Sequence, residues 1–247
     1  MSGISNNQIK FVKSLQQKKV RDEHGLFIVE GEKMVDEAVS SPFKVETIYR
    51  RDEIGDEAMG RMTALANPSP VLAVVRKPED SYIKDASELQ PLLQEGGLYL
   101  ALDAIRDPGN LGTILRIADW FGIKAVFAAP DTVDLFNPKV VQSTMGAIFR
   151  LPFAYVDSLD QVMDRCKELG ITTYAAHLGG KNNYDKEDYH GGSAFLIGNE
   201  GNGLTDHLAD QADVFVKIPM AGKAESLNAA VAAAVLVYEA ARQRNFA

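Results

Sequence analysis

The second half of the chain alternates short apolar segments with stretches in which apolar residues recur every three or four positions. The apolar segments are predicted strands: residues 98–103, 124–129, 153–156, 171–178, 194–198 and 213–218. The stretches with helical spacing are residues 110–121, 138–148, 158–169 and 226–244. Several strands are apolar at nearly every position, as strands buried on both faces are. Strands that alternate with helices predict an α/β fold with a parallel sheet.

The first 76 residues contain shorter elements. Residues 4–17 are amphipathic and residues 32–41 have helical spacing, whereas residues 25–31, 44–49 and 69–75 have the pattern of strands. A polar stretch with Pro and Gly at its edges follows and indicates a linker with a short helix. We therefore expect an N-terminal domain over 1–76, a linker over 77–97 and a second domain over 98–247.

Composition places the chain among ordinary globular proteins. It has 247 residues, of which 46% are hydrophobic and 24% charged. This is enough apolar material to form a core without a disulfide or a structural metal. The one cysteine, Cys166, falls on the apolar side of a predicted helix, so we expect a core thiol in a reducing cytoplasm. The chain's start lacks the apolar centre of a secretory signal, and the longest apolar run, 229–238, is too short to span a bilayer. No metal site is expected, because the histidines lack ligand spacing with Cys166 or one another.

The charge is distributed unevenly. The net charge is −8, which argues mildly against nucleic acid, yet residues 1–21 contain five basic residues and no acidic one. These are Lys10, Lys13, Lys18, Lys19 and Arg21. A solvated helix face explains such a cluster as well as a partner does.

Three junctions between a predicted strand and the loop after it carry polar residues that could bind a ligand, since ligands of open parallel sheets bind beyond the carboxyl ends of the strands. The first contains Asn110 and Arg116, which could also be a helix N-cap and an exposed side chain. The second is the segment 194–204, in which a glycine-rich loop follows the predicted strand; it matches neither the dinucleotide-binding pattern nor the phosphate-loop pattern. In the third, 218–228, Ser226 is a natural N-cap and Asn228 falls in the first helical turn.

Taken together, the three junctions resemble a known family. N-x-G-x-x-x-R at 110–116, I-G-N-E-G at 197–201 and I-P-M-x-G-x-x-E-S-L-N at 218–228 are similar to the motifs of the SpoU (TrmH-like) branch of the SPOUT RNA methyltransferases. Residues 137–153 are similar to the region between the motifs, although Gln142 stands where relatives often have arginine. The N-terminal part, with G-L-F-I-V-E-G-E-K-M-V-D-E-A, resembles a small α/β, ribosomal-protein-like RNA-binding domain.

This resemblance implies a cofactor, a topology and an assembly. It implies methyl transfer from S-adenosylmethionine to a ribose 2′-hydroxyl of structured RNA, a C-terminal trefoil knot, and a homodimer whose active site draws on both subunits. By position, the cofactor would be held by Gly198, Gly201, Ile218, Met220 and Leu227. The polar active-site set would be Asn110, Arg116, Glu200, Ser226 and Asn228. RNA would be bound through Lys10, Lys18, Lys19 and Arg21, and neither DNA nor a membrane is expected as a partner.

The chemistry asked of these residues is limited to alignment and the transfer of one proton. Arg116 is expected to bind the target phosphate and stabilise alkoxide charge rather than act as the base, because guanidinium stays protonated. Glu200 and Asn228 are expected to orient Arg116 and the loop. Ribosomal RNA is favoured over transfer RNA because of the N-terminal domain. A non-catalytic RNA-binding or ribosome-assembly factor on the same fold is the alternative.

Overall fold

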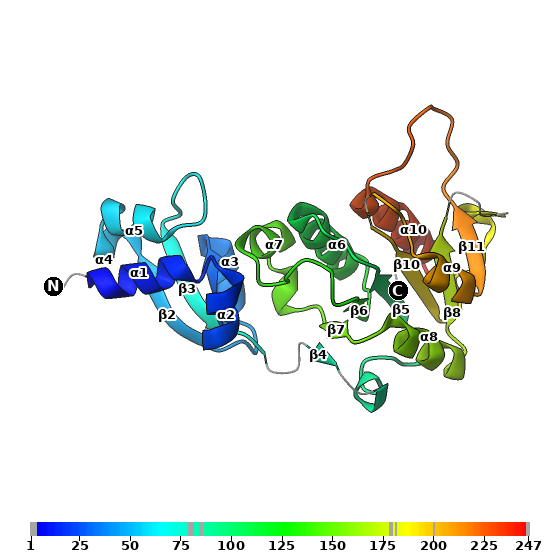
Figure 1. Cartoon of the computed structure of the whole chain (residues 1–247), viewed down its shortest axis with the longest axis horizontal. Coiled ribbons are helices and arrows are strands. Elements are labelled where there is room, and N and C mark those ends of the chain that lie inside the picture. Colours follow the sequence, from blue (N-terminus) through cyan, green and yellow to red (C-terminus); the bar gives the residue numbers. More distant parts are fainter. Residues whose placement is uncertain are drawn as a thin grey trace. The chain divides into compact units, whose positions relative to one another are not determined.

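The computed structural model describes residues 4–78, 82–83, 86–177, 180, 182–199 and 201–245. Its chain divides into two compact units, which are described separately below (Figure 1). Unit 1 consists of Met1–Glu79 together with Asp134–Arg150, and unit 2 of Asp80–Val133 together with Leu151–Ala247. The predicted division at residues 76 and 97 follows chain order. In the structure, the segment 134–150 belongs to unit 1, although residues of unit 2 flank it in the sequence.

Unit 1 is built on a three-stranded antiparallel sheet in the order β1-β3-β2. The strands are β1 (Leu26–Glu30), β2 (Val45–Arg50) and β3 (Val71–Arg76), which confirms the three predicted from the apolar pattern. The helices are α1 (Asn6–Ser14), α2 (Lys18–His24), α3 (Glu32–Val39), α4 (Arg51–Ile54) and α5 (Asp56–Met62). Apolar residues of α1 and α5 share one buried cluster with Ile28, Leu72 and Val74 of the sheet.

The segment 134–150 completes unit 1. It contains α7 (Pro138–Thr144) and a 3₁₀ turn, η2 (Ala147–Phe149). Phe136 packs on Phe27 with ring centroids 4.8 Å apart, and Phe149 packs edge-on against Phe43 at 5.2 Å. Offset and edge-to-face aromatic pairs add stabilisation beyond the area they bury. The segment is therefore part of the packed interior of unit 1.

Unit 2 contains an eight-stranded sheet in the order β4-β7-β6-β5-β10-β8-β11-β9, and each pairing between its described strands is parallel. The strands are β4 (Tyr82–Ile83), β5 (Leu98–Leu102), β6 (Ala125–Ala128), β7 (Phe153–Val156), β8 (Thr172–Ala176), β9 (Asn182–Asn183), β10 (Ser193–Ile197) and β11 (Val214–Lys217). The six predicted strands and the parallel α/β class are confirmed. The two-residue edge strands β4 and β9 are too short to give a pattern.

Helices cover this sheet: α6 (Pro108–Trp120), α8 (Leu159–Glu168), α9 (Asp206–Gln211) and α10 (Ala229–Gln243), with 3₁₀ turns η1 (Ala86–Leu89) and η3 (Tyr184–Lys186). Helix α10 packs against both α6 and β10. No helix among the described residues is long and apolar enough to cross a membrane.

Two sequence expectations concern the interior of unit 2. Cys166 on α8 is fully buried, and burial followed by the charge of Asp213 raises the pKa of its thiol to about 12, so the prediction of a core thiol is confirmed. The polar and aromatic stretch 181–192 predicts a surface loop, and its described residues are exposed or half-buried except Tyr189 and Gly192. Tyr189 is fully buried and stacks edge-on against Tyr174 at 4.9 Å, because these rings close one end of the core.

Candidate active site

Helix α6 begins earlier than its sequence pattern indicated. The N-cap is Asp107, whose Oδ1 accepts a hydrogen bond from the backbone N–H of Asn110 at 2.9 Å. Pro108 occupies the first turn, where its fixed φ suits a helix and its missing N–H costs nothing. The interpretation of Asn110 as an N-cap is therefore wrong. The Asn110 side chain, half-buried in the first turn, is left to make other contacts.

Asn228 makes one of those contacts. It is the N-cap of α10, and its Oδ1 accepts from the backbone N–H groups of Ala230 at 3.0 Å and Val231 at 3.2 Å. Its Nδ2 donates to Oδ1 of Asn110 at 2.9 Å. One amide thus caps α10 and ties the start of that helix to the start of α6. The predicted cap, Ser226, lies instead in the exposed loop before the helix.

The loops after β5 and β10 are joined by side chains that the sequence analysis did not single out. Asn199 donates from Nδ2 to the carbonyl of Ala104 at 2.7 Å and accepts from the N–H of Gly201 at 2.8 Å. Asp103, which is buried at the end of β5, accepts from the N–H of Thr205 at 2.8 Å. A polar residue one or two positions after the end of an apolar strand is the signal that could have identified both. Their bonds fix the backbone at this edge of the sheet.

Gly198 is required by a close approach of two backbone segments. A Cβ atom at this position would lie 2.1 Å from both the carbonyl carbon of Gly203 and the nitrogen of Leu204. The loop closes on itself through paired backbone hydrogen bonds of 2.9 Å between Asn199 and Gly203. Gly201 is exposed in the same loop. Glu200, predicted for the active site, lies outside the residues that the structure describes.

The third predicted junction is the segment between β11 and α10, which rises away from the sheet as an orange loop in Figure 1. Ile218 is half-buried, and residues 219–228 are all exposed. Met220 and Leu227 are among the most exposed large apolar side chains, at 59% and 48%. Such a loop offers backbone donors and acceptors beside apolar side chains. This combination fits a cofactor with an aromatic base and charged ends, such as S-adenosylmethionine.

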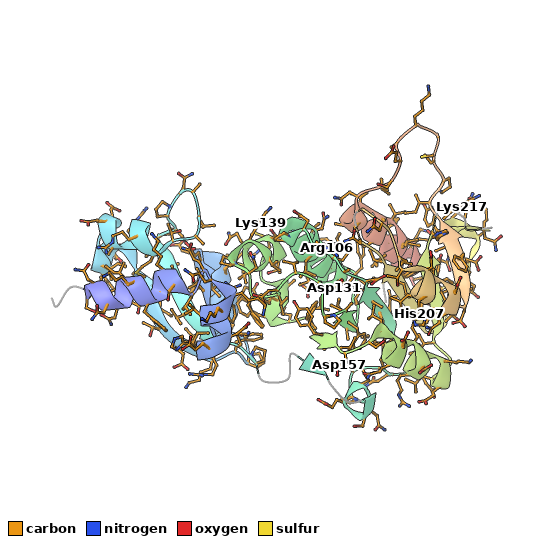
Figure 2. The ribbon with its side chains drawn as sticks, viewed as in Figure 1. Arg106, Asp131, Lys139, Asp157, His207 and Lys217 are labelled. Atoms are coloured by element: carbon orange, nitrogen blue, oxygen red, sulfur yellow. The ribbon has the colours of Figure 1, made fainter. Side chains whose placement is uncertain are left out.

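Arg116 is exposed on α6 and points to a different side from Asn110. Six residues separate them, which corresponds to roughly 120° around a helix and ~9 Å along it. Arg116 instead shares its face with Trp120, four residues on, whose side chain is 81% exposed. Figure 2 shows Arg106, which comes between β5 and α6, near the start of the helix and on the same edge of the sheet.

The predicted RNA-binding residues fall on α1 and α2. Lys10, Lys18 and Lys19 are exposed, and Lys18 pairs with Asp22 at 2.5 Å. Arg21 does not belong to this surface. It is 2% exposed, because its guanidinium pairs with Asp134 at 2.6 Å and donates to two backbone carbonyls. Helical spacing placed Arg21 beside the lysines, but the partner on the distant segment 134–150 draws it inward.

In chemical terms, this edge of unit 2 presents aligned amide groups and backbone N–H groups, with arginines nearby. Neutral amides orient a hydroxyl by accepting and donating hydrogen bonds, and arginine binds phosphate. Such a set suits group transfer from an activated donor, in which the protein aligns the reactants.

Comparisons with known proteins agree with this geometry. The SpoU rRNA Methylase family profile matches residues 97–238, and the profile of the MRM3-like substrate binding domain matches residues 6–79. A 23S rRNA (guanosine(2553)-2′-O)-methyltransferase, RlmP of Bacillus subtilis, is 34% identical over 96% of this chain and 97% of its own.

Two solved structures have the same fold. The AdoMet complex of the SpoU methyltransferase AviRb from Streptomyces viridochromogenes superposes with a TM-score of 0.86 at 29% identity, covering 98% of this chain and 99% of its own. The AdoMet-bound rRNA methyltransferase from Sinorhizobium meliloti gives 0.85 at 32% identity, covering 98% and 97%. With a family profile over more than half of its length and a relative matched over nearly all of it, this chain belongs to the SpoU rRNA methylase family.

Proposed function

We propose that this protein is an S-adenosylmethionine-dependent methyltransferase that modifies a ribose 2′-hydroxyl of ribosomal RNA. The observation that carries the proposal is the hydrogen bond between Asn228 and Asn110, which brings two family motifs together at the carboxyl edge of the sheet. Relatives matched over nearly the whole chain are rRNA methyltransferases by name, and their solved structures hold AdoMet.

Each predicted residue has a role in this reaction. The bound cofactor supplies an activated methyl group. The loop of Gly198 and Gly201 and the segment with Ile218, Met220 and Leu227 hold it. Asn110 and Asn228 orient the ribose hydroxyl, Ser226 lines the site, and Glu200 is assigned from the family motif the role of orienting Arg116. Arg116 binds the target phosphate and stabilises the negative charge that develops on the ribose oxygen as the hydroxyl proton passes to solvent water.

The exposed face of α6 and α10 supports a homodimer. Trp120 is 81% exposed, and Val231 and Tyr238, seven residues apart on α10, are 47% and 48% exposed. The Tyr238 ring packs edge-on against Phe121 at 5.9 Å, which extends the patch onto α6. A contiguous apolar surface of this kind is typical of an interface. Arg116 lies on the same face as Trp120, so in a dimer it reaches the partner's site. Family membership adds a trefoil knot in the C-terminal segment.

The remaining assignments concern the substrate. Residues 1–76 form the RNA-binding domain, ribosomal-protein-like in type, with Lys10, Lys18 and Lys19 on its basic helices; residues 77–97 link it to the methyltransferase domain over 98–247. Phosphate contacts of such a domain release counterions and make binding salt-dependent. A ribosomal RNA substrate and a single cysteine, which cannot form an internal disulfide, both support a cytoplasmic location.

The test is transfer of a labelled methyl group from S-adenosylmethionine to RNA of cells that lack the gene, with the RNA separated by size. Free RNA and ribosomal particles are assayed side by side. The proposal predicts that ribosomal RNA is labelled and that the linkage after one ribose becomes resistant to alkaline cleavage. Arg116→Ala should abolish both effects. RNA binding without transfer to either substrate would instead identify a non-catalytic binding factor.

A further inference from the structure

A cavity of about 300 Å³ lies within unit 1, whereas the residues of the candidate active site belong to unit 2. It is bounded by the end of β1, the loop after α5 and helix α7. The lining residues are Ile28, Glu30, Ala64, Leu65, Ala66, Pro138, Lys139, Val141, Gln142 and Ser143. The volume is at the lower end for a small-molecule site and suits one nucleoside.

The cavity has apolar walls and a small number of polar groups. Ile28, Leu65 and Val141 supply apolar surface, which suits the faces of a flat ring. Glu30 is its only acidic lining residue and is 4% exposed. Lys139 is exposed on α7 (Figure 2), and it provides a positive charge for a phosphate at the rim. Apolar walls with few placed polar groups are characteristic of ligand pockets.

The carboxylate of Glu30 is held in one orientation but retains acceptor capacity. Its Oε2 accepts from the hydroxyl of Thr63, and its Oε1 accepts from the backbone N–H of Ala64 at 2.7 Å. An ionised carboxylate has about four lone-pair sites, two on each oxygen. These two bonds therefore leave one acceptor site on each oxygen. The side chain therefore retains the capacity to accept two further N–H donors.

Among the four standard bases, guanine alone carries two adjacent N–H donors on one edge, at N1 and N2. Adenine and cytosine place an acceptor beside their amino group, and the N–H of uracil lies between two carbonyls. We propose that this cavity binds one unstacked guanine of the RNA substrate through Glu30, and that this guanine is not the nucleotide that is methylated. Proteins read single-stranded RNA in this way, by splayed-out bases and their Watson–Crick edges.

This inference rests on the proposed function, because it takes RNA as the substrate. Anchoring the turn at Thr63 and Ala64 does not by itself require a carboxylate. A glutamine at position 30 can accept from the N–H of Ala64 through its oxygen and donate to the Thr63 hydroxyl through its nitrogen. Glu30→Gln therefore preserves the turn while replacing one of the two outward acceptors by a donor. The variant therefore distinguishes a role of Glu30 in guanine recognition from a role in holding the turn.

The experiment measures binding of 5′-GMP, 5′-IMP and 5′-AMP to the full-length protein by calorimetry, with S-adenosylhomocysteine present in excess to block the cofactor site. GMP should bind most tightly. IMP keeps N1–H but lacks the N2 amine, so it should bind roughly tenfold more weakly, since a hydrogen bond to a charged group is lost. Ala66→Trp should abolish GMP binding by filling the exposed mouth. Asn67→Trp, on the next residue of that loop but not lining the cavity, should retain it.

Glu30→Gln gives the sharper result. An amide that presents one acceptor and one donor pairs with adenine, so the variant should lose preference for GMP and gain it for AMP. Equal binding of all three nucleotides by the native protein, or unchanged GMP binding by Ala66→Trp, would overturn the proposal. If the native protein methylates ribosomal RNA but binds no GMP, the guanine pocket is contradicted and the proposed function is not. If the native protein transfers no methyl group to any RNA, the proposed function is contradicted instead.

Discussion

The guanidinium of Arg21 bonds to three oxygens: one carboxylate oxygen of Asp134, on the segment 134–150, and the carbonyls of Leu15 and Gln16 just after α1. It is 2% exposed, and Asp134, its partner at 2.6 Å, has a side chain only 11% exposed. Removal of one partner from a buried ion pair leaves an uncompensated charge, which costs about 3–5 kcal/mol. We expect Arg21→Met to destabilise the protein by about 3 kcal/mol, measured by urea unfolding.

Lys18→Met provides the control, because it removes a basic residue of the same helix from an exposed pair with Asp22. Exposed pairs contribute little, so its unfolding midpoint should stay close to that of the native protein. Equal midpoints for the two variants would mean that the Arg21 pair does not hold segment 134–150. The sequence could not distinguish the two residues, since the partner that buries Arg21 is 113 positions away.

Helix α10 owes its start to Asn228, whose amide performs two tasks with two different atoms. The oxygen caps the helix and the nitrogen bonds to Asn110. Aspartate caps a helix as well as asparagine does but cannot donate. Asn228→Asp should therefore keep its thermal midpoint. In this variant, the hydrogen bond to Asn110 forms again only if the Asn110 side-chain amide flips, so that its nitrogen donates to Asp. The flip exchanges the donor and the acceptor that Asn110 offers to the ribose.

We expect methyl transfer by Asn228→Asp to fall roughly a hundredfold, as misplaced catalytic groups do. Asn228→Ala is the companion variant and should lose both activity and about 1 kcal/mol of stability. Rates come from labelled methyl transfer, and stabilities from thermal unfolding. Full activity in Asn228→Asp would show that the Asn110 contact is structural only.

The glycine-rich loop after β10 depends on one position in particular. At Gly198 an added methyl group would lie 2.1 Å from the backbone of Gly203 and Leu204, neither of which is a flexible side chain. The loop must shift to accommodate it, so Gly198→Ala should weaken cofactor binding roughly five- to a hundredfold, the equivalent of an overpacking cost of ~1–3 kcal/mol. Calorimetric titration with S-adenosylmethionine measures this change.

Gly191→Ala is a suitable comparison, because an added Cβ there has no neighbour within 4 Å. Its cofactor affinity should match that of the native protein. If Gly198→Ala also binds normally, the backbone approach at Gly198 serves the fold and not the cofactor.

Element positions in this chain were predictable where burial repeats with a simple period. Strands buried on both faces, such as β5 and β10, gave continuous apolar runs, and α6 and α10 gave clear helical spacing. Helix starts were less predictable, because Asn110 and Ser226 looked as suitable for capping as Asp107 and Asn228, the residues that do it. The choice depends on the loop geometry before each helix, which local sequence does not encode.

For the molecule as a whole, chain order was a poor guide to packing. The segment 134–150 leaves unit 2 after β6 and returns before β7, yet its Phe136 and Phe149 pack with residues of the first domain. Unit 1 is consequently joined to unit 2 by three chain crossings rather than by one linker. Motif resemblance suggested the candidate site residues, and the six-residue spacing on α6 puts Arg116 on a different face of that helix from Asn110.

That separation makes a prediction about assembly. If each active site combines Asn110 of one protomer with Arg116 of the other, then Asn110→Ala and Arg116→Ala are inactive alone but complement each other when mixed. Random exchange of equal amounts makes half of the dimers mixed, and each mixed dimer has one site with both native residues. Activity should then recover to about a quarter of the native value, as two-fold symmetry requires.

The measurement is labelled methyl transfer before and after the two variants are unfolded together and refolded. A site made within one chain predicts no recovery at all, because each chain in the mixture still lacks one residue. When the double variant Asn110→Ala/Arg116→Ala is mixed with native protein, the two arrangements predict the opposite outcomes. Its mixed dimers keep one active site if both residues come from the same chain, and none if the site is shared, since each shared site then has one native and one substituted residue.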